Sequence, residues 1–239
     1  MKNTFVIILL FFTTLFSQEN EIVADSFEGV DIYQNVYYTL NGIFYKQNKN
    51  QTWEYQNLQY GTPTDIDTNN PLEIMVYYQD LQQLVVLDNR LNFINSYTIP
   101  FGISHIANAG NNTLWIYNTL NSRIQRYNLN NQTIELSSLP LKNEIIDLKG
   151  NLNHVFAYNS NKELIHFNQL SRETKREKTA EIKHTVSLRS NHIIKKNTLY
   201  LNNKTVLQEL KELTSFEITN NVFYCFNGTK INWLDLNQN

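Results

Sequence analysis

The sequence predicts an all-β protein, and three observations support this prediction. Aromatic residues make up 13% of the 239 residues, and the 14 Tyr and 13 Phe far outnumber the 2 Met, a composition that favours pleated strands over helices. Asn is abundant where alternating apolar segments end, as expected of turns, because Asn tolerates the left-handed backbone conformation. A group of strands also recurs along the chain. With 41% hydrophobic and 18% charged residues, the chain can build one sizeable core.

The repeat is clearest in two segments about 40 residues apart. Residues 74–100 (IMVYYQDLQQLVVLDNRLNFINSYTIP) align with residues 114–140 (LWIYNTLNSRIQRYNLNNQTIELSSLP), so that Tyr77 matches Tyr117. Each copy reads as an apolar-aromatic strand, a polar turn, an alternating strand, an Asn-rich turn, a third strand and a proline stop. A third copy begins at Phe156. Repeats of this period and strand content are typical of the blades of a β-propeller.

Ahead of each hairpin a polar residue precedes an aliphatic one, and we interpret each such pair as part of the innermost strand of a blade. Six pairs at intervals of about 32 to 42 residues predict a single propeller of six blades, with five or seven as alternatives. The pairs are Asp31-Ile32, Asp65-Ile66, His105-Ile106, Asp147-Leu148, Thr185-Val186 and Glu217-Ile218. An open ring would leave sheet edges exposed. We therefore expect residues 21–27 (EIVADSF) to supply the fourth strand of the last blade, so that the two ends of the chain meet.

The short motifs of the repeat carry a resemblance to known families. The Leu-x-x-aromatic-Asn turn, the Ile-x-x-Tyr strand and the Asn-x-x-Asn-Gln-Thr turn resemble the strand-turn-strand core of YVTN-type and quinoprotein-like propeller repeats. The resemblance covers most of the chain after the N-terminus and implies the propeller fold. Quinoprotein dehydrogenases hold their cofactor with tryptophan-rich motifs, whereas Trp53, Trp115 and Trp233 fall within the predicted hairpins, so we expect no cofactor. The Gly-His and Trp-Asp signatures of WD repeats are missing.

The N-terminus indicates export. Residues 1–18 contain Lys2, an apolar run over residues 5–16 and then small and polar residues, which is the layout of a secretory signal peptide. The run is too short for a comfortable membrane span. Residues 19–239 then form the mature propeller domain, in the periplasm, associated with the outer membrane or outside the cell, without spanning the membrane. A retained N-terminal anchor is the alternative.

Propellers usually bind ligands where the innermost strands begin and their loops converge. We therefore predict that five polar residues of these strands form a ligand-binding ring: Asp31, Asp65, His105, Asp147 and Glu217. A mostly carboxylate ring could hold a hard cation such as Ca²⁺, or a cationic ligand. Alternatively, these residues are solvated and turned away from the axis. The five histidines and seven glycines match neither a metalloprotease motif nor a phosphate loop, so we predict no catalytic residue and no defined metal motif.

Two further features have simple interpretations. The single cysteine, Cys225, stands among aromatic residues, where we expect it to act as a small hydrophobic side chain. Residues 171–184 (SRETKREKTAEIKH) predict a charged outer strand that protects a sheet edge, with a docking patch for an acidic partner as the alternative. The formal net charge of −2 gives no reason to expect nucleic acid as a partner.

Together these features predict a non-catalytic scaffold for protein interactions in the bacterial cell envelope, accessory to outer-membrane assembly or secretion. We expect a monomer within a larger complex, whose partner is an envelope protein or a cell-wall glycan. Aromatic residues on the loops between blades, such as Tyr60 and Phe101, would contact this partner or pack into the core. The alternative function is a metal-dependent lactonase or lyase that uses the inner-strand carboxylates.

Overall fold

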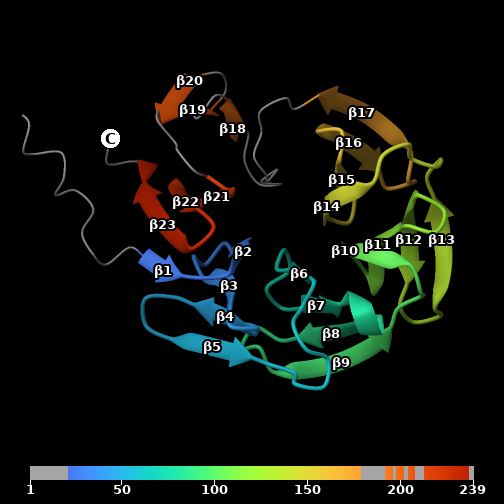
Figure 1. Cartoon of the computed structure of the whole chain (residues 1–239), viewed down its shortest axis with the longest axis horizontal. Coiled ribbons are helices and arrows are strands. Elements are labelled where there is room, and N and C mark those ends of the chain that lie inside the picture. Colours follow the sequence, from blue (N-terminus) through green and yellow to red (C-terminus); the bar gives the residue numbers. More distant parts are fainter. Residues whose placement is uncertain (1–20, 179–191, 196–197, 202–203, 208–212, 237–239) are drawn as a thin grey trace, which may run out of the picture.

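The computed structural model describes residues 21–178, 192–195, 198–201, 204–207 and 213–236. Their strands form six sheets of antiparallel strands arranged in a ring, and Figure 1 looks along the axis of this ring. Apart from one short 3-10 helix, η2 (Gln79–Leu81), the regular elements in these ranges are strands. The fold is therefore an all-β propeller, as predicted. No helix within the same ranges is long and apolar enough to cross a membrane. The predicted signal peptide lies outside the described residues.

Four of the sheets are four-stranded blades whose strands follow chain order from the innermost to the outermost. The first is β2 (Ser26–Val30), β3 (Val36–Leu40), β4 (Ile43–Gln47) and β5 (Thr52–Tyr55). The second is β6 (Asp65–Asp67), β7 (Ile74–Tyr78), β8 (Gln83–Leu87) and β9 (Phe93–Thr98). The third is β10 (Ile103–Gly110), β11 (Thr113–Asn118), β12 (Arg123–Asn128) and β13 (Thr133–Ser137). The fourth is β14 (Ile145–Gly150), β15 (His154–Asn159), β16 (Glu163–Asn168) and β17 (Glu173–Lys178).

A further four-stranded blade combines strands from both ends of the chain and closes the ring. It consists of β21 (Ser215–Thr219), β22 (Val222–Phe226), β23 (Lys230–Asp235) and the N-terminal β1 (Glu21–Val23). β1 pairs antiparallel with β23, and Ile22 lies opposite Ile231. The predicted closing strand is confirmed for residues 21–23, whereas Ser26 already belongs to β2.

The prediction of six blades is wrong, because the described residues form five complete blades. The remaining sheet has three strands, β18 (His192–Lys195), β19 (Thr198–Leu201) and β20 (Lys204–Leu207). Each of these three strands has four residues, so the described part of this segment carries a short sheet in place of the four-stranded blade that the spacing of the polar-aliphatic pairs predicted. The predicted pair Thr185-Val186 lies outside the described residues.

Burial distinguishes the inner and outer strands of a blade. β7 (IMVYY) and β11 (TLWIYN) are buried throughout, and their β-branched and aromatic side chains suit a strand packed between two neighbouring sheets. β13 (TIELS) and β17 (ETKREK) are the outermost strands of their blades and are mostly exposed. The charged outer strand predicted within residues 171–184 is thus confirmed for β17, where the charges cover a sheet edge.

Asparagine builds many of the turns, which explains its abundance. Its carboxamide oxygen accepts backbone N–H groups two to four residues ahead, as Asn159 does from Asn161 and Glu163 at 3.0 and 2.9 Å. Several asparagines also adopt a positive φ between 51° and 61°, a conformation that they tolerate well: Asn41, Asn111, Asn112, Asn220 and Asn221.

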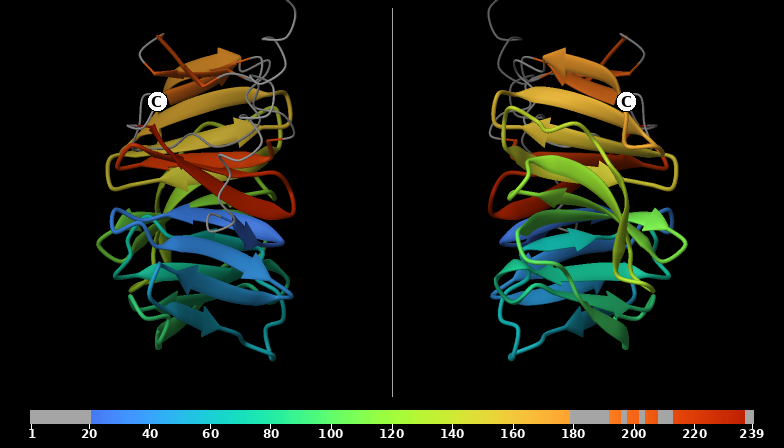
Figure 2. Two further views of the ribbon diagram at one scale, coloured as in Figure 1. Left: turned by 90° about the vertical axis from the view of Figure 1, so that its left-hand side faces the viewer. Right: turned by 90° about the vertical axis from the view of Figure 1, so that its right-hand side faces the viewer.

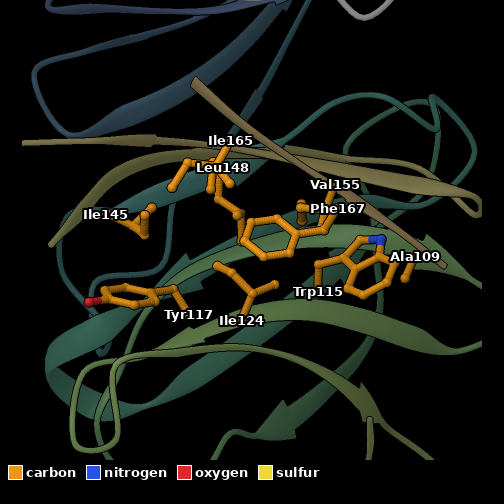
Figure 3. Packing of buried hydrophobic residues seen from close by; sticks show 11 residues of the cluster. Ala109, Trp115, Tyr117, Ile124, Ile145, Leu148, Val155, Ile165 and Phe167 are labelled. Atoms are coloured by element: carbon orange, nitrogen blue, oxygen red, sulfur yellow. The ribbon is translucent and has the colours of Figure 1, made fainter. Parts of the chain in front are cut away.

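The hydrophobic core lies in layers between neighbouring blades. Figure 3 shows the layer between β10–β12 and β14–β16, where Trp115 packs with Leu148 and Phe167, each at most 2% exposed. The Trp115 indole N–H donates to the Asn151 carbonyl at 2.8 Å, which satisfies its polar atom. Gly150 permits this packing, because a Cβ atom there would lie 2.6 Å from Trp115 Cδ1.

The strands run roughly along the ring axis, so the loops gather on two opposite faces, at the two sides of each view in Figure 2. Because the strands of a blade alternate in direction, one face holds the loops between second and third strands together with the loops that lead into the next blade. The other face holds the remaining turns. This division decides which exposed loop side chains share a surface.

Candidate functional site at the innermost strands

Four of the five predicted ligand-binding residues lie at equivalent positions on innermost strands. Each stands opposite a tyrosine of the second strand of its blade. The pairs are Asp65 with Tyr77, His105 with Tyr117, Asp147 with Tyr158 and Glu217 with Tyr224. The strands that carry them, β6, β10, β14 and β21, lie around the centre of the ring (Figure 1). The polar-aliphatic pattern therefore identified these innermost strands correctly.

Asp31 departs from this arrangement, because it lies in the turn after β2. Gly29 takes the equivalent position on β2, because it stands opposite Tyr37 after a bulge like those that precede His105 and Asp147. The Asp31 carboxylate is 1% exposed and accepts hydrogen bonds from the Asn35 side chain at 2.7 Å and the Tyr37 hydroxyl at 2.8 Å. Its position makes Asp31 a structural residue of the turn, and it does not stand with the other four.

Asp65 and His105 lie next to each other on neighbouring innermost strands. Asp65 Oδ2 lies 3.6 Å from His105 Nδ1 and accepts the backbone N–H of Ile106 at 2.9 Å. Burial alone would lower the pKa of His105, but the hydrogen bond and charge of Asp65, the charge of Asp147 and a hydrogen bond to the Ile145 backbone raise it above the ordinary histidine value. His105 on β10 therefore joins β6 on one side to β14 on the other.

Two more carboxylates bind the backbone of a neighbouring innermost strand. Asp67, which the sequence analysis missed, is 3% exposed and accepts the Asn108 N–H at 2.7 Å. Burial raises the pKa of Asp67, although the hydrogen bond from Asn108 opposes this effect. Glu217 on β21 accepts the Val30 N–H on β2 at 2.8 Å across the ring closure. With Asp65, these residues tie two innermost strands, β6 and β21, to the innermost strands that follow them around the ring, β10 and β2.

Lys149 on β14 is the cation that the sequence analysis missed. Burial alone would lower its pKa, but the nearby carboxylates of Asp147, Asp65, Asp67 and Glu28 raise it above the usual lysine value. Burial raises the pKa of Glu28, while its hydrogen bond with Ser26 and the charge of Lys149 oppose this rise. A single ammonium group thus interacts with carboxylates from three different innermost strands. The signal for it was Lys149 two positions after Asp147, on the same face of an alternating strand.

The described acidic residues are not arranged as a metal site. Within the part of the chain that the structure describes, no group of three His, Cys, Asp or Glu side chains is placed to hold a metal ion. The carboxylates instead accept hydrogen bonds from backbone N–H groups. Asp65 also lies beside the His105 imidazole, and the positive charge of Lys149 acts on several of them. Chemically, this arrangement is suited to holding innermost strands together.

The remaining predicted residues have clear places. Tyr60 is half-buried and packs on Tyr78 with ring centroids 5.3 Å apart, so it belongs to the core. Phe101 is 78% exposed on the loop between β9 and β10. Cys225 is partly buried, and burial raises its pKa to about 11, which keeps the thiol protonated and unreactive at neutral pH.

Comparisons with known proteins extend only to the fold. No known protein family matches the sequence, and no curated protein resembles it significantly. A chain in the structure of the mitotic checkpoint complex aligns with a TM-score of 0.57 and 9% identity, over 92% of this chain and 95% of that chain. The structure of BBS1N in complex with ARL6DN aligns with a TM-score of 0.56 and 9% identity, over 90% and 92%.

An enzyme structure aligns equally well. Virginiamycin B lyase from Staphylococcus aureus has a TM-score of 0.54 and 13% identity, over 86% of this chain and 78% of the lyase. The three alignments establish a β-propeller fold. Because their sequence identities are low, they establish nothing more, and the function has to be argued from the residues of this chain.

Proposed function

We propose that this protein is a non-catalytic binding scaffold, exported into a bacterial cell envelope and acting as a monomer within a larger complex. The observation that carries the proposal is the use of the inner-strand carboxylates: Asp65, Asp67 and Glu217 each accept a backbone N–H from the neighbouring innermost strand. These groups hold the ring together, so binding falls to the loop-bearing faces of the propeller.

The alternative function, a metal-dependent lactonase or lyase, would need a different arrangement of these carboxylates. A metal-dependent lyase or lactonase needs carboxylate oxygens that converge on one ion and remain available to it. Here an oxygen atom of Asp65 approaches both His105 and the Ile106 N–H, while Lys149 supplies positive charge next to Asp147. A lysine among these acids offsets the negative charge that would attract a divalent cation.

Export is proposed from the layout of residues 1–18, and it sets the class of partner. An envelope propeller meets other envelope proteins and cell-wall glycans, and we propose one of these as the partner. The formal net charge of −2 offers no strong electrostatic attraction for a polyanion such as nucleic acid.

Crosslinking of the tagged full chain in isolated envelopes, followed by mass spectrometry, tests the scaffold. Wild type and the double variant Asp65→Ala/Asp147→Ala should crosslink to the same envelope components, provided that circular dichroism shows both to be folded. Glu54→Ala, which removes an exposed acid from the outer strand β5, is the matched control. Elemental analysis of the purified proteins should find substoichiometric metal in all three. Stoichiometric divalent metal in wild type and its loss in the double variant would instead establish the enzyme alternative.

A further inference from the structure

Five loops on one face of the propeller form a continuous surface, which we call the apolar arc. They comprise residues 56–64, 79–82, 99–102, 119–122 and 138–144. Each loop either joins the second and third strands of a blade or leads into the next blade, so all five lie on the same face.

Hydrogen bonds link each loop of the apolar arc to the next. The Gln79 N–H donates to Thr64 Oγ1 at 2.9 Å, and the Ile99 N–H donates to the Gln82 carbonyl at 2.7 Å. Further along, the Thr119 N–H donates to the Gly102 carbonyl at 2.8 Å, and the Leu141 N–H donates to the Ser122 carbonyl at 2.7 Å. The loops are therefore neighbours in space in the same order as in the chain.

Every loop of the arc exposes a large apolar side chain. The exposed fractions are 85% for Leu58, 49% for Leu81, 78% for Phe101, 69% for Leu120 and 82% for Leu139. Single exposed apolar residues are common on protein surfaces, but a connected series of them on one face marks an interaction site.

The arc is also held in shape before any partner binds. A Cβ atom on Gly102, whose φ is +87°, would lie 2.5 Å from Leu120 Cγ, so the loops 99–102 and 119–122 are in close contact. Pro100 and Pro140 restrict two of the loops. A surface that is already ordered loses little conformational entropy when it binds.

The charge of the arc indicates what kind of partner it fits. Three of its loops, 56–64, 99–102 and 119–122, contain no charged residue, and the other two contribute Asp80, Lys142 and Glu144. An anionic lipid surface is recognised by clusters of Lys and Arg, and Lys142 is the single basic residue in these loops. Protein interfaces, in contrast, are depleted of charge at their centres and enriched in aromatic residues.

We propose that the apolar arc is the docking surface of the scaffold and that it binds an uncharged segment of a partner protein rich in apolar side chains. This inference rests on the proposed scaffold function and specifies its binding face. Phe101 and Leu120, on loops in close contact near the middle of the arc, anchor the partner.

Selection of random peptides displayed on phage tests the chemistry of this surface directly. The full folded protein is the target, and binding of the enriched peptides is measured on wild type, on Phe101→Ser/Leu120→Ser and on Phe93→Ser/Ile94→Ser. The last variant is the matched control, since it removes two exposed apolar side chains, 60% and 51% exposed, from the outer strand β9 away from the arc.

The enriched peptides should be apolar and uncharged. They should bind Phe101→Ser/Leu120→Ser at least about tenfold more weakly than wild type and bind the control variant equally well. Enrichment of charged peptides, equal binding to the arc variant, or no enrichment would overturn the proposal.

Two other occupants are separated by measurements on the same variants. If sedimentation shows that wild type self-associates and the arc variant does not, the occupant is a second copy of this chain. Binding to phosphatidylcholine and phosphatidylglycerol vesicles that is lost in the arc variant would assign the arc to a lipid surface. Either result overturns the proposed partner.

The envelope crosslinking experiment separates the arc from the scaffold function. If the arc variant Phe101→Ser/Leu120→Ser forms the same crosslinks as wild type, the scaffold function stands and the arc is the wrong face. If neither protein forms crosslinks to envelope components, the scaffold function itself fails.

Discussion

The junction between β6 and β10 and the junction between β21 and β2 use the same chemistry over very different chain separations. At the first, Asp65 and Asp67 accept backbone N–H groups 41 residues ahead. At the second, Glu217 accepts from Val30, 187 residues away, and closes the ring. Closing a longer loop costs more conformational entropy, yet among the described residues the closure shows one such carboxylate bond. The β1–β23 pairing and a cluster of buried side chains that includes Val30, Tyr224 and Ile231 add to the closure.

The largest effect is expected from Gly29, which allows Glu217 to approach β2. Its φ is +139°, and a Cβ atom there would lie 2.8 Å from Glu217 Oε2. Gly29→Ala should lower the free energy of unfolding by about 3 kcal/mol, because it combines backbone strain with displacement of the closing carboxylate. Urea denaturation measures this loss. Gly61→Ala is the control, since Gly61 also has a positive φ but no neighbour within 4 Å, and it should cost about 1 kcal/mol. Equal losses would show that closure contributes nothing beyond strain.

The two junctions can be compared through their carboxylates. Glu217→Ala removes an acceptor of the Val30 N–H and should cost about 2 kcal/mol, because it breaks a hydrogen bond between a charged side chain and a buried backbone N–H. Asp65→Ala should cost about 1 kcal/mol, because Asp67 still joins β6 to β10. Denaturation of both variants in the same buffer measures the difference. A greater loss for Asp65→Ala would reverse the comparison and identify the β6–β10 junction as the weaker one.

The His105 link should make stability depend on pH. The folded pKa of His105 lies above its ordinary value of about 6.5, so between these two values the folded state binds more protons than the unfolded state. The stabilisation is complete below pH 6.5 and is lost as the pH rises through the folded pKa. His105→Gln should remove this decline from a series of denaturation curves. Burial lowers the pKa of His166, so the folded state favours the neutral form of this side chain. The stability that His166 contributes to the folded state is therefore present above pH 6.5 and is lost as the pH falls. His166→Gln should therefore leave the decline above pH 6.5 in place.

The smallest effect is expected at the surface of the closing junction. The Asn220 side chain donates to the Ile32 carbonyl at 2.9 Å, in an exposed position. Asn220→Gly should cost about 0.5 kcal/mol, because water replaces the lost partner and glycine tolerates the positive φ of 51° at this position. Thermal unfolding of this variant alone and combined with Glu217→Ala measures whether the two bonds act together. A combined loss equal to the sum of the single losses would mean that the two bonds stabilise the closure independently.

The sequence reveals features that repeat, because repetition leaves a signal at fixed spacing. Tyr77 and Tyr117 aligned in the sequence, and in the structure they stand opposite Asp65 and His105 at equivalent positions. Asp31 was misplaced because Gly29 occupies the position that corresponds to His105 and Asp147, each after a similar bulge, and a glycine there breaks the polar-aliphatic pattern. Asp67 was missed because its hydrogen-bond partner lies on another innermost strand, and Lys149 because three of the four carboxylates near it do.

The sequence alone determined that the chain is an all-β propeller with its N-terminal strand in the last blade, because strand and turn propensities recur locally along it. The tertiary structure decided which residues serve which role. Asp65 and Glu217, two carboxylates of the predicted ligand ring, accept backbone N–H groups of neighbouring strands, and four exposed leucines and a phenylalanine from five loops lie on one face. Both outcomes depend on contacts between blades, which no local pattern of residues encodes.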